Sequence, residues 1–290
     1  MQFLGRAHAI ATAVVHGPGG VALIDPGPST CRAALELGLQ EHGIRLGDVT
    51  HILLTHVHLD HAGATGSIVR DHPAIAVTVH ERGAPHVIDP TRLVQSAARL
   101  WGDDMDRLWG EVAPVPAANL TIVKGGERIA VGGRWFDVAY TPGHASHHVS
   151  YFDAASGVAF VGDTGGMRID RGTVLPPTPP PDIDLEVWSR SVEIIERWSP
   201  ATLFRTHFGP SDRVRGELAE MLDLLQVMAR MVRESLDEPG SDDVRSAEFA
   251  ERLRQLLRRD MSDAQLDTYG LSAPFHLLWL GLARYWRKRT

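Results

Sequence analysis

Residues 55–61 read Thr-His-Val-His-Leu-Asp-His and directly follow a short apolar run. Three imidazoles and one carboxylate in so short a segment can hold two transition-metal ions side by side. Alternate residues of an extended segment point the same way, so we expect His56 and His58 to reach one ion. Asp60 and His61 come after the chain has begun to turn and can face a second ion. Donors of this kind, without thiolate, suit zinc, with iron or manganese as alternatives.

Three further potential ligands stand farther along the chain, each at the end of a predicted strand. They are His144, Asp163 and His207. Each follows a β-rich run and has Gly, Pro or Thr beside it, which is typical of a strand that ends in a loop. Ligands at strand ends lie on one rim of a sheet core, on loops held by a rigid scaffold. The sequence therefore predicts that these side chains join residues 55–61 in one metal centre.

These motifs resemble those of the metallo-β-lactamase superfamily, and the likeness extends from the segment Leu23–Gly27 to about His207. The resemblance implies an α/β fold, the αββα sandwich, in which two sheets lie between layers of helices. It also implies that Asp25 and Thr55 support the ligands from outside the centre. Carried over residue by residue, the ligands of the first metal are His56, His58 and His144, those of the second are Asp60, His61 and His207, and the bridging ligand is Asp163.

Such a centre implies a hydrolase. Two divalent ions about 3.5–4 Å apart would lower the pKa of a bridging water to near neutrality and supply hydroxide. Two divalent ions carry four positive charges. Asp60, Asp163 and one hydroxide contribute three negative charges, so the centre keeps a net positive charge. It should therefore favour a polarised carbonyl or phosphoryl oxygen. We expect an ester, thioester or lactone substrate, with Asp60 as the catalytic group that accepts a proton when the tetrahedral intermediate collapses.

The substrate is less clearly indicated than the superfamily. The segment 141–148 is similar to the glyoxalase II pattern, but His147 stands where that branch generally has glycine. Residues 165–170 lack the Gly/Cys-rich, basic-aromatic stretch of glutathione thioester hydrolases and persulfide dioxygenases. Phosphodiester hydrolysis, persulfide oxygenation at a single iron and a non-enzymatic metal scaffold stay as alternatives. His147 and His148 can each donate a hydrogen bond to substrate or pack at the start of a strand.

Composition sets the remaining bounds. The 290 residues are 43% apolar and 22% charged, which is typical of a soluble globular protein. A net charge of −7 argues against the basic surface that nucleic-acid binding requires. No apolar run reaches the length of a membrane span, and the single cysteine, Cys31, excludes an intrachain disulfide. We therefore expect a cytoplasmic enzyme that acts on a small molecule, without a nucleic-acid or membrane partner.

The chain divides into a predicted catalytic domain, residues 1–211, and a predicted C-terminal helical domain, residues 212–290. The second part carries three amphipathic helical patterns with no strand signal between them. Helical extensions in this superfamily often cover the metal cleft, so the resemblance implies the same here. The apolar face of the last helix is expected to pack within the chain, with a homodimer contact as the alternative.

Two segments stand outside the predicted scaffold. Residues 84–117 are predicted to be helical, and Trp101 and Trp109 either pack against the scaffold or face the substrate. The segment Pro176–Pro181 is dominated by proline and is therefore stiff and extended. We expect it to form either one wall of the cleft or a rigid linker.

Overall fold

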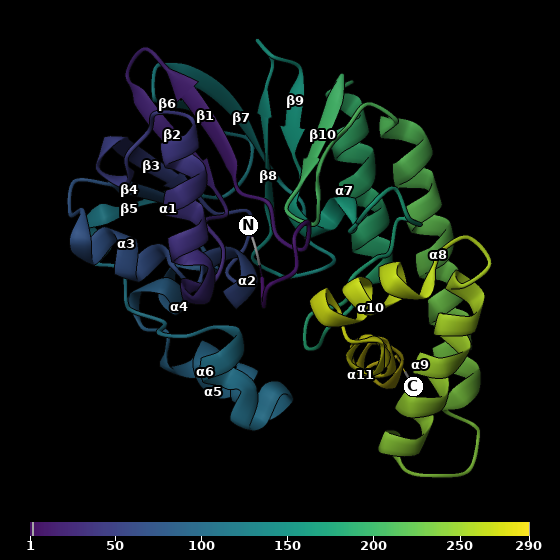
Figure 1. Cartoon of the computed structure of the whole chain (residues 1–290). Helices are drawn as coiled ribbons and strands as arrows, with labels where there is room; N and C mark the ends of the chain where they lie inside the picture. The colour runs from purple at the N-terminus through teal and green to yellow at the C-terminus, as the bar shows by residue number, and fades with distance from the viewer. Residues whose placement is uncertain (2, 290) are drawn as a thin grey trace.

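Two β-sheets face each other between layers of helices in the computed structural model, which describes residue 1 and residues 3–289 (Figure 1). The first sheet has the strand order β1-β2-β3-β4-β5. Its strands are β1 (Ala13–Gly17), β2 (Gly20–Ile24), β3 (Val49–Leu53), β4 (Ala76–His80) and β5 (Leu120–Val123). The hairpin β1–β2 is antiparallel and the other neighbours are parallel.

The second sheet has the order β11-β10-β9-β8-β7-β6 and is antiparallel except between β9 and β10. Its strands are β6 (Arg128–Val131), β7 (Arg134–Tyr140), β8 (Val149–Asp153), β9 (Val158–Phe160), β10 (Thr202–Arg205) and β11 (Gly209–Ser211). The short edge strand β11 was not expected from the sequence. Its three residues are Gly-Pro-Ser, which do not have the composition of a strand.

Side chains of β2 alternate between two cores. Val21 and Leu23 pack under the outer helices, whereas Ala22 and Ile24 pack between the two sheets. On the opposite side of the inter-sheet core, Phe136 of β7 is fully buried. Both faces of the first sheet are thus covered, as its nearly continuous apolar strands require. The αββα sandwich predicted from the sequence is confirmed.

Short helices follow the strands of the first sheet. They are α1 (Arg32–Glu41), α2 (Leu59–Ala62), α3 (Thr65–Asp71), α4 (Ala84–Ile88), α5 (Thr91–Trp101) and α6 (Met105–Leu108). Helices α2 and α3 are separate, because the Ala64 N–H donates to the Gly27 carbonyl (2.8 Å) instead of continuing the hydrogen bonds of α2. The 3-10 helices are η1 (Ser29–Cys31), η2 (Leu46–Asp48), η3 (Gly102–Asp104), η4 (Ala117–Asn119) and η5 (Gly162–Gly165).

The later helices cover the second sheet and continue into the C-terminal region. They are α7 (Leu185–Arg197), α8 (Val214–Ser235), α9 (Asp242–Leu257), α10 (Asp263–Ser272) and α11 (Phe275–Arg287). Helix α10 was missed because it has almost no amphipathic pattern, although the capping box of Ser262 and Gln265 marks its start. Ser241 caps α9 by accepting the N–H of Val244. None of the helices in the described part of the chain has the length and hydropathy needed to cross a bilayer.

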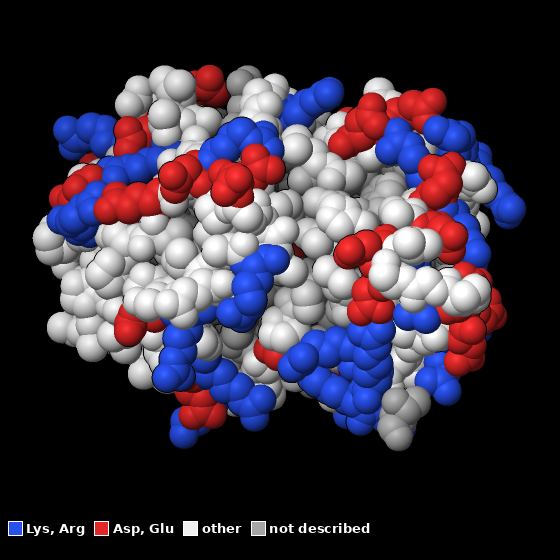
Figure 2. All heavy atoms as spheres, turned by 90° about the horizontal axis from the view of Figure 1, so that it is seen from below, with Lys and Arg blue, Asp and Glu red and all other residues white. Residues whose placement is uncertain are grey.

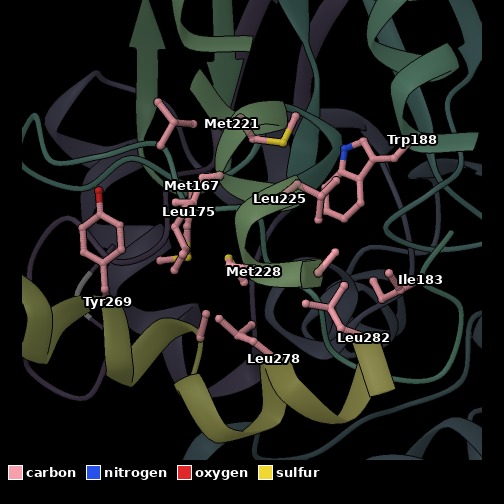
Figure 3. Close-up of a cluster of buried hydrophobic side chains, with 14 of the residues drawn as sticks. Met167, Leu175, Ile183, Trp188, Met221, Leu225, Met228, Tyr269, Leu278 and Leu282 are labelled. Atoms are coloured by element: carbon pink, nitrogen blue, oxygen red, sulfur yellow. The ribbon is translucent and has the colours of Figure 1, made fainter. Parts of the chain in front are cut away.

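The C-terminal helices and the second sheet share one hydrophobic core (Figure 3). Helix α8 contributes Leu225, and α11 contributes Leu278, which pack with Trp188 of α7. Other buried members of this core are Met167, Leu175, Ile183, Met221, Met228, Tyr269 and Leu282. The predicted boundary between residues 211 and 212 thus passes through a continuous core, and it stays a prediction.

A buried ionic cluster also joins α8 to the second sheet. The carboxylate of Glu217 is fully buried and accepts hydrogen bonds from Arg205 (2.7 Å), Ser211 (2.7 Å) and Arg168. The Arg205 Nε–H also donates to the Gly165 carbonyl (2.7 Å). Removing one partner of such a buried pair would leave a charge unpaired, so this cluster fixes the orientation of α8.

If the helices and the second sheet form one cooperative unit, Leu225→Ala should destabilise the whole molecule by about 2–5 kcal/mol. The control Leu37→Ala removes a side chain that is 62% exposed, and it should change the free energy of unfolding by no more than about 0.5 kcal/mol. Urea unfolding followed by far-ultraviolet circular dichroism measures both. Two separate unfolding transitions, one for each predicted domain, would show that the helices and the second sheet do not unfold as one cooperative unit.

Candidate metal centre

All seven predicted ligands lie together at one end of the sheets. They come from the loops and the short helix that follow β3, β7, β9 and β10. Three overlapping groups have donor atoms within 4.8 Å of one another: His56 with His58 and His144, His56 with His61 and Asp163, and Asp60 with His61 and His207. Residues far apart in the sequence are therefore collected into one cluster, as expected for ligands at strand ends.

The first two histidines do not lie on the strand itself. Strand β3 ends at Leu53, and residues 54–58 form an extended loop in which His58 has φ −61° and ψ 151°. Helix α2 begins at the next residue and carries Asp60 and His61. The change from extended chain to helix turns the second pair of donors away from the first.

Short distances separate the donor atoms within each predicted set. His58 Nδ1 lies 3.0 Å from both His56 Nε2 and His144 Nε2. Asp60 Oδ2 lies 3.2 Å from His207 Nε2 and 3.7 Å from His61 Nε2. Each set therefore presents three donors toward one point.

Asp163 lies between the two sets. Its Oδ1 is 3.3 Å from His61 Nε2 and 3.8 Å from His207 Nε2, whereas its Oδ2 is 3.4 Å from His144 Nε2. One carboxylate oxygen thus faces each set, which is the arrangement that a bridging ligand needs.

The donors fit bound metal cations. His61 Nε2 and Asp163 Oδ1 are buried and have no hydrogen-bond partner among the described residues. A buried polar group left unpaired costs about 1–3 kcal/mol, and more if it is charged. Imidazole and carboxylate donors at these positions would be satisfied by zinc, iron or manganese ions. The chemistry of the cluster thus agrees with metal binding.

The electrostatics of the cluster differ between its two sides. Burial and the neighbouring His144 lower the pKa of His58 to about 4. Burial would raise the pKa of Asp60, but His61 and the hydrogen bond from His207 outweigh it and lower that pKa to about 2. Burial also opposes the charged form of His61, yet Asp163 and Asp60 raise the pKa of His61 well above its usual value. The carboxylates thus attract positive charge, which metal ions would supply in place of protons.

Asp25 holds the centre from outside. Its Oδ2 accepts hydrogen bonds from His61 Nδ1–H (2.8 Å), Thr55 Oγ1 (2.7 Å) and Thr206 Oγ1 (2.7 Å), and its Oδ1 accepts the Thr55 N–H (2.8 Å). The bond to Nδ1 directs the Nε2 lone pair of His61 into the cluster. The backbone of Asp25 has φ +52°, an uncommon conformation for a residue with a side chain. The surrounding contacts hold it there.

Two other ligands are oriented by backbone carbonyls. His144 Nδ1–H donates to Pro177 (2.8 Å), and His207 Nδ1–H donates to Ala9 (2.7 Å). These bonds fix the tautomers, so that Nε2 of both rings faces the cluster. The proline segment is therefore more than a linker, since it positions a candidate ligand.

His147 and His148 have different surroundings. His148 is fully buried, and its Nδ1 lies 3.0 Å from Thr141 Oγ1 and 3.2 Å from Thr164 Oγ1. His147 instead lines the cleft, with its Nδ1 accepting the Val57 N–H (3.4 Å). Burial and the neighbouring His58 hold the pKa of His147 well below its usual value, so the ring is neutral and its proton is on Nε2. Nε2 makes no hydrogen bond to another residue that the structure describes.

A cleft of about 410 Å³ opens above the cluster. Its base includes His58 and Asp163, and its walls come from α5, the proline segment and the start of α11. Trp101 and Trp109 both line it, and Trp109 is also buried against Phe3 with ring centroids 5.7 Å apart. Both expected roles of this region, packing and cleft wall, are thus present.

Comparison with known proteins settles the family. A sequence model described as the metallo-beta-lactamase superfamily matches residues 6–207. The chain belongs to this superfamily. Among solved structures, the metallo-beta-lactamase family protein TTHA1429 from Thermus thermophilus superposes with a TM-score of 0.72 at 25% identity, over 97% of this chain and 89% of that one. The superfamily and the donor groups together indicate a metal-dependent hydrolase.

Curated relatives are more distant. The metallo-beta-lactamase fold-containing protein ST1585 of Sulfurisphaera tokodaii is 29% identical over 167 residues, covering 57% of this chain and 62% of the relative. A hydroxyacylglutathione hydrolase of Legionella pneumophila is 29% identical over 128 residues, covering 42% of this chain and 38% of the relative. The chain thus spans less than two thirds of the length of either protein.

Removal of Asp25 should loosen the second donor set, because His61 would lose the acceptor that orients it. We expect Asp25→Ala to weaken binding of one equivalent of zinc about 10–100-fold. The milder change Thr206→Val removes one of the four hydrogen bonds and should have a smaller effect. Competition with a chromogenic chelator measures both affinities, and equal affinities for Asp25→Ala and the natural chain would contradict this role.

Proposed function

We propose that this protein is a dinuclear metal-dependent hydrolase that acts on the carbonyl of an ester, thioester or lactone. The observation that carries this proposal is the position of Asp163, whose two oxygens face different sets of nitrogen donors. The proposal assigns His56, His58 and His144 to the first ion, Asp60, His61 and His207 to the second, and Asp163 to both. Zinc is the first choice, with iron or manganese as alternatives.

Two divalent ions, when bound, would supply an activated water near neutral pH and polarise the substrate carbonyl. The residues of the chain then orient the substrate and move its protons. In the net reaction, the C–O or C–S bond of the substrate breaks, and water gives its oxygen to the acid and one proton to the departing alcohol or thiol. Asp60, with its pKa lowered to about 2, is unprotonated at neutral pH, so it can accept that proton from water and then pass it to the departing alcohol or thiol.

His147 is suited to stabilise negative charge on the substrate. It is neutral, its Nε2 carries the proton, and the ring lines the cleft with a centroid 5.6 Å from that of His58. A donor fixed beside the reacting carbonyl can stabilise the oxyanion that forms on attack. We propose that His147 Nε2–H makes this hydrogen bond.

Metal analysis is the first test. Protein purified without added metal or chelator should contain two equivalents of zinc, iron or manganese, and chelation should abolish hydrolysis of simple thioesters. Two equivalents combined with restored activity on re-addition would support the proposal. One equivalent of iron together with oxygen-dependent turnover of a persulfide would contradict it.

Asp60→Asn tests the proton-transfer role. We expect kcat to fall at least about 100-fold, because general acid–base groups typically contribute about 10²–10⁴-fold. The metal content of the variant must be measured at the same time. A variant with both ions and full turnover would show that Asp60 only binds metal or has no role.

His147→Ala should lower kcat about 10²–10³-fold, as does loss of a typical oxyanion donor, while metal content and KM change little. The matched control is His86→Ala, since His86 lines the same cleft without the hydrogen bond that fixes the His147 ring. An equal loss of kcat in both variants would indicate a general disturbance of the cleft.

A further inference from the structure

The cleft above the donor cluster has an apolar wall built by α5. The side chains of Leu93, Ala97, Leu100 and Trp101 all line the cleft and recur at the spacing of one helix face. None of the residues of α5 is fully buried. This apolar face is therefore only partly covered by the protein, and its uncovered part borders the space next to the reacting centre.

The facing wall comes from a segment far away in the sequence. Ala273 and Pro274 precede α11, and Leu277 and Leu278 begin it, and all four line the cleft. The proline segment closes the space between the two walls through Pro177 and Pro179–Pro181. Arg284 and Lys288 of α11 donate to the Pro181 carbonyl (3.2 and 3.4 Å), which fixes this segment against the helix. Both walls of the cleft are thus apolar, and hydrogen bonds from α11 hold the proline segment in place.

Charged groups are few along these walls. Arg92 is the single Lys or Arg among the described residues that line the cleft. A view from below, the side on which α5 and α11 lie, shows most basic groups around the periphery and one basic group near the middle among uncharged residues (Figure 2). A substrate with several negative charges would need several fixed cations, whereas an apolar group would gain from burial of the α5 face.

We propose that the cleft binds a carboxylic ester or thioester that carries one extended apolar group. This inference rests on the proposed hydrolase function and names its substrate class. The apolar group lies between α5 and the start of α11, while the carbonyl reaches the donor cluster at the base of the same cleft. A volume of about 410 Å³ lies within the range of about 300–1,000 Å³ that is usual for small-molecule sites.

Chain length gives a quantitative test of the proposal. S-Methyl thioesters of acetic, butanoic, hexanoic and octanoic acids form one series, and S-methyl to S-heptyl thioacetates form the mirror series. In one of the two, kcat/KM should rise up to about fourfold per methylene until the cleft is filled. The series that responds shows whether the acyl or the thiol side holds the apolar group. Hydrolysis with no dependence on length in either series would overturn the inference and leave the hydrolase function standing.

A binding measurement separates this inference from catalysis. The 2-alkanones from butanone to octanone carry a carbonyl and an alkyl chain but cannot be hydrolysed. Calorimetry with the protein as purified should give affinities that rise with chain length, in the same sense as the thioesters. If no thioester is hydrolysed but this dependence is present, the proposed function is wrong and the apolar site stands. Affinities that do not change with length would overturn the site.

Three variants of α5 locate the apolar group. Ala97→Phe fills the cleft from its wall, and Ala98→Phe adds the same ring at a position outside the lining. We expect Ala97→Phe to reduce the preference for the longest over the shortest substrate by about tenfold or more, while Ala98→Phe keeps the natural preference. Leu100→Ala, which enlarges the cleft, should shift the optimum to longer chains. Equal preferences in Ala97→Phe, Leu100→Ala and the natural chain would overturn the placement on α5.

Discussion

The candidate metal centre depends on the buried carboxylate of Asp25. Its four hydrogen bonds join the end of β2 to Thr55, to His61 on α2 and to Thr206 after β10. These are the segments that carry most of the second donor set, and they belong to different sheets. A carboxylate buried without these donors would be strongly unfavourable, so folding of the sandwich and alignment of the donors require each other. The left-handed backbone of Asp25 is held by the same contacts.

Much of the donor cluster could be predicted from the sequence, because its residues stand in recognisable local sequence patterns. Strands and their ends are marked by apolar runs that meet Gly, Pro or Thr, and each donor stands at such an end. The parallel strands β9 and β10 finish on one rim of the second sheet, so Asp163 and His207 can be expected to lie close together, whereas their approach to the 55–61 segment after β3 depends on how the two sheets pack. The αββα sandwich was implied by the resemblance to the metallo-β-lactamase superfamily. Metal identity and substrate are not encoded in this way.

The parts that could not be predicted depend on contacts between distant segments. Nothing near Pro177 indicates that its carbonyl accepts a hydrogen bond from His144, and nothing near Leu93 or Ala97 shows that their face of α5 borders the metal centre. The different surroundings of His147 and His148 arise only when Val57, Thr141 and Thr164 come together. Helix α10 was not predicted, because it has no amphipathic pattern and is stabilised by tertiary packing.

The order of these parts along the chain has a consequence during translation. All the donors lie between residues 56 and 207, whereas one wall of the cleft, Ala273–Leu278, is synthesised later. At about 5–20 residues per second, the delay is on the order of several seconds. Because the C-terminal helices share one core with the second sheet, the cleft is complete only when the last residues have been made and have packed against it. The C-terminal helices thus form the wall that encloses the donor cluster at the end of the sandwich.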